Sequence, residues 1–302
     1  MINKTQLKNA IRRKEFIVVY QPIVALASGH CAGAEVLVRW RREDGALLAP
    51  DRFLLAAQRH GCLDAITDLV IDQAITQTGA MLRDHPDLHL AVNVPANDIN
   101  SGRILNVIAR KLAGSGIACK QLWLEVTEGC SMELPACLET LSRARSNGHV
   151  IALDDFGTGY SCLRYLHELP CDVLKLDRSF VASIGADAMP HPVTACIIEM
   201  ARQLRLRIVA EGVETPEQAC YLKRAGVDFA QGWFFARPMP ASDFLGHCGF
   251  EAPMSTVSPA ESRLPLATPA SAPVKILAGA SPAGDMAPRL IIGKELLEVM
   301  KH

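Results

Sequence analysis

The segment VIALDDFGTGYSCL, residues 150–163, ends an apolar run with two adjacent acids, Asp154 and Asp155. Neighbouring carboxylates repel each other, and Asp is depleted from β-strands. A turn needs only one such residue. The glycines that follow, Gly157 and Gly159, leave the backbone free to bend back over the acids. The pair therefore suggests a bound positive charge, and its nature has to be read from the rest of the chain.

This run is one of eight short apolar or β-branched segments between residues 7 and 251. Amphipathic helical segments, such as residues 64–84, separate most of them. This alternation predicts an α/β fold, a modified (β/α)8 TIM-type barrel with one antiparallel strand. The antiparallel strand is expected because residues 16–23 and 34–40 are joined by a connection too short for a helical crossover.

Composition divides the chain near residue 252. Residues 1–251 carry the barrel pattern and are predicted to form one domain. Residues 252–302 are rich in Pro, Ala and Ser and have no sustained periodicity, which is typical of a flexible tail. An amphipathic helix over residues 289–302 is compatible with the pattern, either as a docking segment or as an inert end.

Charge and cysteine content exclude several classes of protein. The formal net charge is -1, so binding to a nucleic-acid polymer or an anionic membrane is not favoured. The ten cysteines are scattered singly and no signal peptide is visible, which predicts reduced thiols in a cytoplasmic protein. No apolar stretch reaches the roughly 18–20 residues of a membrane span, so no membrane segment is expected in this chain.

Polar side chains recur at or near the end of every predicted strand. In a barrel these ends converge on one face, where active sites are built. Any one of them alone is readily explained as a solvated rim residue, but a water-facing rim has no reason to favour oxygen ligands so consistently. In chain order they are Gln21, Glu35, Asn93, Glu125 with Glu128, Asp154 with Asp155, Lys175 with Asp177, Glu211 with Glu214, and Gln231.

Carboxylate and amide oxygens are the ligands of hard cations, so this set favours Mg²⁺ or Mn²⁺ over zinc. Many acids in one pocket would otherwise raise one another's pKa values. Two divalent ions remove that conflict, and paired ions of this kind serve phosphoryl chemistry. We therefore interpret Asp154 and Asp155 as metal ligands, with Lys175 and Arg39 as positive charges for a phosphate.

Eight ordered segments resemble the EAL-domain cyclic-di-GMP phosphodiesterase family. They are YQPIV, AEVLVRW, VNVP, LEVTE, DDFGTGYSCL, LKLD, AEGVET and QGWFFARP, and the resemblance covers residues 7–250. It implies a modified barrel that hydrolyses cyclic di-GMP to linear pGpG with two Mg²⁺ or Mn²⁺ ions. It also implies a homodimer that forms near the loop at residues 156–163.

The resemblance assigns metal-ligating roles to six residues. Asp154 is implied to bridge the two ions, with Asp155 on the second ion and Glu211 close to it. The residues implied to hold the first ion are Glu35, Asn93, Glu125 and Asp154.

The same resemblance assigns the remaining roles. Lys175 is implied to contact the attacking water or the phosphate. The predicted catalytic residues are Glu35, Lys175 and Glu211. Gln21, Arg39 and Gln231 are implied to bind the substrate or its water network. The acids implied to anchor loops are Glu128 and Glu214.

Two positions depart from the family pattern. Val36 replaces Ala in the signature triplet, and Cys162 replaces Ser in the loop. Neither removes a metal ligand, so an active hydrolase is the preferred interpretation. The alternatives are a non-catalytic cyclic-di-GMP receptor or protein-interaction module on the same fold, and an unrelated barrel metal hydrolase.

Overall fold

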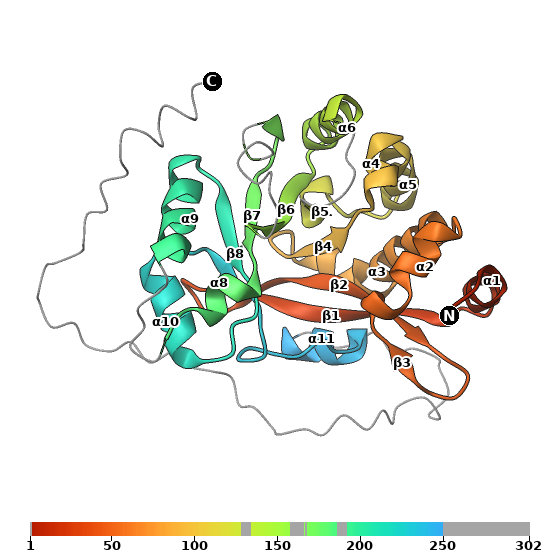
Figure 1. The fold of residues 1–302 in the computed structure, drawn as a ribbon, viewed down its shortest axis with the longest axis horizontal. Helices are drawn as coiled ribbons and strands as arrows, with labels where there is room; N and C mark the ends of the chain where they lie inside the picture. The colour runs from red at the N-terminus through yellow and green to blue at the C-terminus, as the bar shows by residue number, and fades with distance from the viewer. Residues whose placement is uncertain (1, 128–133, 158–165, 167, 186–191, 250–302) are drawn as a thin grey trace, which may run out of the picture.

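The computed structural model describes residues 2–127, 134–157, 166, 168–185 and 192–249. Within them, the strands follow the order β1-β9-β8-β7-β6-β5-β4-β2, and β2 pairs in turn with β1, so these eight strands close into a barrel. Helices lie around the outside of this barrel (Figure 1). The barrel strands are β1 (Phe16–Ala25), β2 (Cys31–Arg41), β4 (His89–Asn93), β5 (Leu122–Thr127), β6 (Val150–Phe156), β7 (Val173–Leu176), β8 (Arg207–Ala210) and β9 (Phe229–Ala230).

The predicted antiparallel strand is confirmed, and it is β1. This strand runs antiparallel to β2 and to β9, whereas each neighbouring pair from β2 through β4 to β9 is parallel. One short strand was not predicted: β3 (Leu47–Leu48) extends the end of β2 as a hairpin outside the barrel. Two residues are too few to show a period-2 pattern in sequence.

The helices fall where the amphipathic segments predicted them. The predicted helix at residues 64–84 is α3, whose buried residues recur at helical spacing on one face. The described helices are α1 (Lys4–Arg12), α2 (Leu54–Arg59), α3 (Leu63–Asp84), α4 (Ala96–Asn100), α5 (Arg103–Leu112), α6 (Leu134–Ser146), α8 (Arg178–Ala182), α9 (Pro192–Gln203), α10 (Pro216–Arg224) and α11 (Ala241–His247), with 3-10 turns at Pro50–Arg52 and Cys119–Gln121.

The interior of the barrel is filled by a compact apolar layer that is separate from the larger core between strands and helices. Each of its residues alternates with an outward-facing strand residue, as the pleat requires. This layer fixes the distance between facing strands and forms the base on which the next layer of side chains rests. Its fully buried members are Ile23, Ala91, Trp123, Ala152, Val173 and Val209.

An aromatic stack lies at the amino-terminal end of the parallel strands. The ring of His89, at the start of β4, stacks on Trp123 with centroids 3.5 Å apart, and Phe229 meets both rings edge-on. Gly33 on β2 is required here, because a β-carbon would lie 2.1 Å from the carbonyl oxygen of His89. Burial, reinforced by the charge of Arg207, lowers the pKa of His89 to about 3.

This buried histidine predicts a specific loss of stability in acid. Its pKa is lowered by folding, so below about pH 6.5 the unfolded chain binds a proton that the folded chain does not. Between pH 7.5 and pH 5 the parent should lose about 2 kcal/mol of unfolding free energy through this one group. His89→Phe keeps a flat ring against Trp123 and should remove that loss, as measured by urea unfolding at both pH values.

The matched control is His30→Phe, a change at an exposed histidine between β1 and β2. It should leave the pH dependence of the parent in place. An acid sensitivity of the His89→Phe protein equal to that of the parent would exclude His89 as its source.

The predicted tail, residues 252–302, lies outside the described residues, and so do Glu128 and Cys162. Among the residues that the structure does describe, no helix combines the length and apolar character that crossing a membrane requires.

Candidate active site

Directly beyond the apolar layer, each barrel strand, or the residue directly after it, contributes a polar side chain to a second layer. Each of these residues lies two positions along the chain from a strand residue that faces the interior, so that it projects into the same interior. Glu125, for example, follows Trp123, and Lys175 follows Val173. The members of the layer are Gln21, Glu35, Asn93, Glu125, Asp154, Lys175, Glu211 and Gln231.

Two of these residues do not lie at the end of a strand, contrary to expectation. Glu35 lies in the middle of β2, and Gln21 lies inside β1, directly opposite Glu35 in the antiparallel register. Because β1 runs in the opposite direction, its carboxyl end points away from this layer. Gln21 therefore reaches the level of the site through the pairing of β1 with β2, and not by lying at the end of its strand.

Lys175 lies at the centre of the layer, with 1% of its side chain exposed. Its Nζ is 2.7 Å from Glu125 Oε1 and 2.7 Å from Glu211 Oε1. It is also 3.0 Å from Asp154 Oδ1 and 3.7 Å from Glu35 Oε2. One ammonium thus gathers carboxylates from four other strands or strand ends into a single cluster.

Two amide side chains hold these carboxylates in place. Asn93 Nδ2 donates to both Glu35 Oε1 and Glu125 Oε2, at 3.1 Å each. Gln231 Nε2 donates to Glu35 Oε2 at 2.7 Å and to Glu211 Oε1 at 3.3 Å. The amides therefore orient three acids without neutralising their charge.

The acids of the cluster resist full ionisation when no further cation is bound. Burial raises the pKa of Glu125 well above its ordinary value, and burial raises the pKa of Glu211 to about 8. Burial by itself lowers the pKa of Lys175, but the surrounding carboxylates raise it well above its ordinary value, so the ammonium is retained. When ionised, four carboxylates against one ammonium leave three negative charges. Such an excess is costly to bury without further cations.

A β-bulge in β6 explains how the adjacent acids Asp154 and Asp155 both face the site. The pairing of β6 with β7 shifts register between Leu153 and Phe156, and Asp155 adopts a left-handed conformation with φ of 54°. Successive strand residues normally point to opposite faces. The bulge changes the direction of Asp155, a residue type that tolerates this conformation better than most. Consequently Asp154, Asp155 and Glu211 each bring a carboxylate oxygen within 4.8 Å of the others.

The donor set fits divalent cations of the hard class. The cluster offers carboxylate and amide oxygens, which suit Mg²⁺ or Mn²⁺. Gln231 Oε1 is buried and, within the described part of the chain, accepts no hydrogen bond, so one further oxygen acceptor is available. With Asp155 included, five carboxylates surround one ammonium. When all five are ionised, the net charge of the cluster is four negative charges, which two divalent ions would balance.

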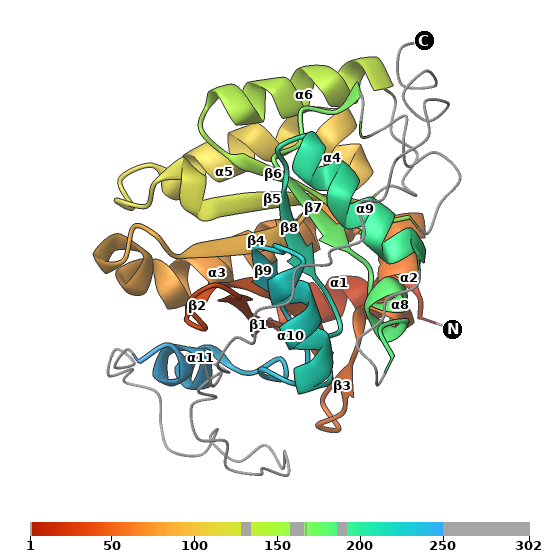
Figure 2. The same ribbon diagram turned by 90° about the vertical axis from the view of Figure 1, so that its left-hand side faces the viewer.

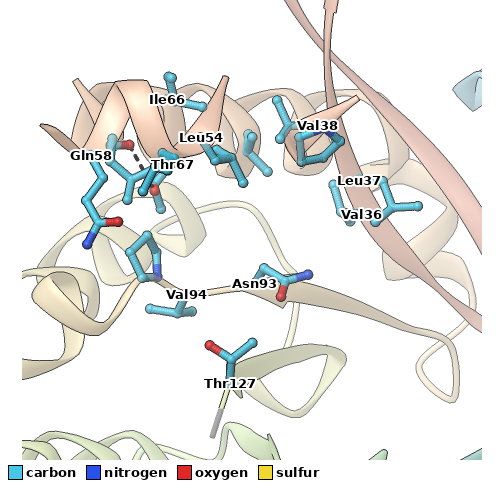
Figure 3. A pocket seen from close by; sticks show the side chains of 15 residues that line it. Val36, Leu37, Val38, Leu54, Gln58, Ile66, Thr67, Asn93, Val94 and Thr127 are labelled. Carbon is cyan, nitrogen blue, oxygen red and sulfur yellow. Dashed lines mark hydrogen bonds between the residues drawn. The ribbon is translucent and has the colours of Figure 1, made fainter. Parts of the chain in front are cut away.

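A pocket of about 480 Å³ opens beside the cluster and shares Asn93 with it (Figure 3). Its walls are mainly apolar and come from β2, α2, α3 and the segment after β4, including Leu37, Leu54 and Pro95. Figure 3 shows Gln58 and Thr67 among the polar groups at its wall. A flat ring system with polar edges, such as a nucleobase, matches this combination.

Two further predicted residues, Arg39 for substrate binding and Glu214 for loop anchoring, are not members of the polar layer. Arg39 is half-buried on β2 two residues beyond Leu37, and its Nη1 donates to Val38 O at 2.8 Å. Burial lowers the pKa of Arg39, although Glu35 opposes this. The Glu214 side chain is exposed, and its backbone N–H donates to Gln218 Oε1 at 2.8 Å. Their predicted roles stay predictions.

Sequence reasoning missed the residues that form the apolar pocket. Leu54 and Gln58 on α2, and Ile66 on α3, were assigned only to amphipathic helices. Nothing in their spacing distinguishes a helix face that lines a pocket from one that packs in a core. The one local signal was Pro95, two residues after the predicted ligand Asn93.

The chain is similar to known proteins over most of its length. The family model described as the EAL domain matches residues 4–238. The chain is 41% identical over 241 residues to the probable cyclic di-GMP phosphodiesterase PdeB of Escherichia coli, covering 80% of this chain and 46% of that protein. It is 39% identical to the cyclic di-GMP phosphodiesterase NbdA of Pseudomonas aeruginosa, covering 82% of this chain and 32% of that protein.

A solved structure described as the PaMucR phosphodiesterase in complex with c-di-GMP matches with a TM-score of 0.73 and 36% identity, covering 80% of this chain and 98% of that chain. The EAL enzyme Bd1971, solved with cAMP and cyclic di-GMP bound, matches with a TM-score of 0.75 and 29% identity, covering 81% of this chain and 68% of that chain. The chain spans less than half the length of the curated relatives PdeB and NbdA.

Proposed function

This chain belongs to the EAL domain family, and on that premise we propose that it hydrolyses cyclic di-GMP to linear pGpG with the help of divalent ions. The observation that carries the proposal is the buried cluster of acids and amides, complete across the barrel strands. The reaction adds the oxygen of one water to phosphorus and breaks one P–O bond of the ring, and the sugar oxygen of that bond takes up a proton and is freed as a hydroxyl group.

The acids and amides of the cluster are proposed to hold two ions, Mg²⁺ or Mn²⁺. Such ions polarise a phosphate and lower the pKa of a water near them. Asp154 is assigned to both ions because it belongs to the acids gathered around Lys175 and also to the group of three, with Asp155 and Glu211, whose carboxylate oxygens lie within 4.8 Å of one another. The proposed ligands are Glu35, Asn93, Glu125 and Asp154 for one ion, and Asp154, Asp155 and Glu211 for the other.

Lys175 is proposed to supply fixed positive charge beside the phosphate or the attacking water. It is buried and protonated, so its charge is not screened by solvent. Gln231 is proposed to keep Glu35 and Glu211 oriented through its two hydrogen bonds while it contacts the water network. Residues already held in place need little reorganisation during the reaction.

The apolar pocket beside Asn93 is proposed to receive one guanine of the substrate. Its volume of about 480 Å³ and its mainly apolar walls suit a base, and its position next to the cluster leaves a phosphate near the acids. Arg39 and Gln21 are proposed to contact the nucleotide from β2 and β1.

Arg39→Ala should weaken binding of cyclic di-GMP by roughly 10–100-fold, because a charged hydrogen bond to the ligand is lost. Uptake of Mn²⁺ should be unchanged, since Arg39 is not among the proposed ligands. Calorimetric titration with the nucleotide, and separately with Mn²⁺, measures both. Arg42→Ala, at an exposed arginine in the turn after β2, is the matched control. Equal affinity in the Arg39 and Arg42 variants would remove Arg39 from the substrate site.

The decisive test of the proposed function is identification of the product. The full chain is incubated with cyclic di-GMP and Mg²⁺ or Mn²⁺, and the products are separated by chromatography and weighed by mass spectrometry. Linear pGpG supports the hydrolase. Tight binding without turnover in either ion would replace it by the alternative, a cyclic-di-GMP receptor or protein-interaction module.

The division into a domain at residues 1–251 and a tail at residues 252–302 is also proposed here. Truncation after Pro253 should leave the melting temperature within about 2 °C of the full chain, because a segment that buries little apolar area contributes little stability. Calorimetry of both proteins measures this. A fall well beyond that margin would mean that the tail packs on the barrel. The homodimer and the cytoplasmic location stay predictions.

A further inference from the structure

Two cysteines that are far apart in sequence meet at the side of the barrel away from the acid cluster. Cys31 is the first residue of β2, and Cys248 is the cap residue directly after α11. Their sulfur atoms lie 2.8 Å apart. Figures 1 and 2 show why: α11 lies along the β1–β2 hairpin, so the last described helix reaches the first hairpin of the chain.

The two sulfurs are chemically unequal. The Cys248 thiol donates to Cys31 Sγ, and this contact lowers the pKa of Cys31, while burial opposes the change. The same contact raises the pKa of Cys248. A thiolate is the reactive form of cysteine, so Cys31 is the nucleophile of the pair and Cys248 supplies the proton and then the second sulfur.

Both side chains are only half-buried, so a small oxidant can reach them. The sulfurs need to approach by roughly 0.8 Å more to reach bonding distance. That displacement is small enough for side-chain rotation and a slight movement at the end of α11.

We propose that Cys31 and Cys248 form a reversible disulfide that covalently fastens α11 to the barrel when a peroxide is present. Cys31 thiolate attacks one peroxide oxygen, the O–O bond breaks, and water leaves after protonation, which oxidises Cys31 to a sulfenic acid. The Cys248 sulfur then attacks the Cys31 sulfur, the S–OH bond breaks, and a second water leaves. A dithiol reductant reverses the bond by exchange.

The bond joins positions 217 residues apart, so it closes nearly the whole described chain into one loop. Cross-linking over such a distance restricts the unfolded chain strongly. Oxidation should therefore raise the melting temperature by about 5 °C or more. It leaves the acid cluster untouched, since Cys31 lies four residues before Glu35 on β2.

The test uses the full chain, reduced and freed of reductant, then treated with a small molar excess of hydrogen peroxide. Remaining thiols are alkylated under denaturing conditions, and the protein is digested with trypsin without reduction. Cys31 and Cys248 fall in separate fragments, residues 15–39 and 225–263, each of which holds one cysteine. The expected species is these two fragments joined, lighter than their sum by two hydrogens and separated again by dithiothreitol.

Cys31→Ser and Cys248→Ser should each abolish the linked fragment and the rise in melting temperature. Cys220→Ser, at an exposed cysteine of α10, is the matched control and should keep both. The proposal is overturned if Cys31 is recovered alkylated after oxidation, if it is joined to another cysteine, or if Cys31→Ser shows the same thermal shift as the parent.

Discussion

Asp154→Asn is expected to reduce the rate of cyclic di-GMP hydrolysis roughly a thousandfold, while binding of the nucleotide is largely kept. Asn has the same shape as Asp but lacks its charge, and one of its atoms is a donor where an acceptor is needed. Asp154 is the proposed ligand common to both ions, so both should be held less firmly. A loss of about 4 kcal/mol of transition-state stabilisation corresponds to this factor.

Steady-state product formation gives the rate, and calorimetric titration with Mn²⁺ gives the number of ions bound. The variant should bind fewer ions than the parent. Asp87→Asn, the same change at an exposed residue in the turn before β4, is the matched control and should turn over normally. A rate for Asp154→Asn within tenfold of the parent would contradict the assignment of Asp154 as a shared ligand.

Removal of divalent ions is expected to abolish hydrolysis and to lower the melting temperature by several degrees. When ionised, the cluster has four carboxylates around one ammonium, with Asp155 adjacent, so its negative charges repel one another without bound cations. A bound ion at a hundred times its dissociation constant adds about 2.7 kcal/mol of stability. Added Mg²⁺ or Mn²⁺ should restore both properties, whereas Ca²⁺ should bind without supporting turnover because its coordination is looser.

The measurement is a paired assay of turnover and thermal unfolding, first in excess chelator and then after each metal is added back. Asp154→Asn serves as the internal control, because its melting temperature should respond less to metal than that of the parent. Full turnover in excess chelator would refute the metal-dependent reaction. A rise in melting temperature with metal, but no product, would instead favour the receptor.

The sequence by itself determined the barrel and most of its polar layer. Eight apolar segments alternate with helical ones, and these patterns depend on neighbours within a few residues. Glu125, Asp154 and Lys175 could be chosen because each lies at or near the end of a predicted strand, and the carboxyl ends of barrel strands converge on one face. The ordered motifs then indicated the family to which the chain belongs.

Only the tertiary structure decided how distant segments meet. Gln21 reaches the site through the antiparallel register with Glu35, and Asp155 turns toward Asp154 through a bulge opposite β7. The apolar pocket exists because side chains of α2, α3 and β2, which are separate in sequence, line one cavity. Cys31 and Cys248 become neighbours because the barrel closes and returns α11 to its first hairpin. Such contacts depend on loop closure and packing across the whole chain, which no local period encodes.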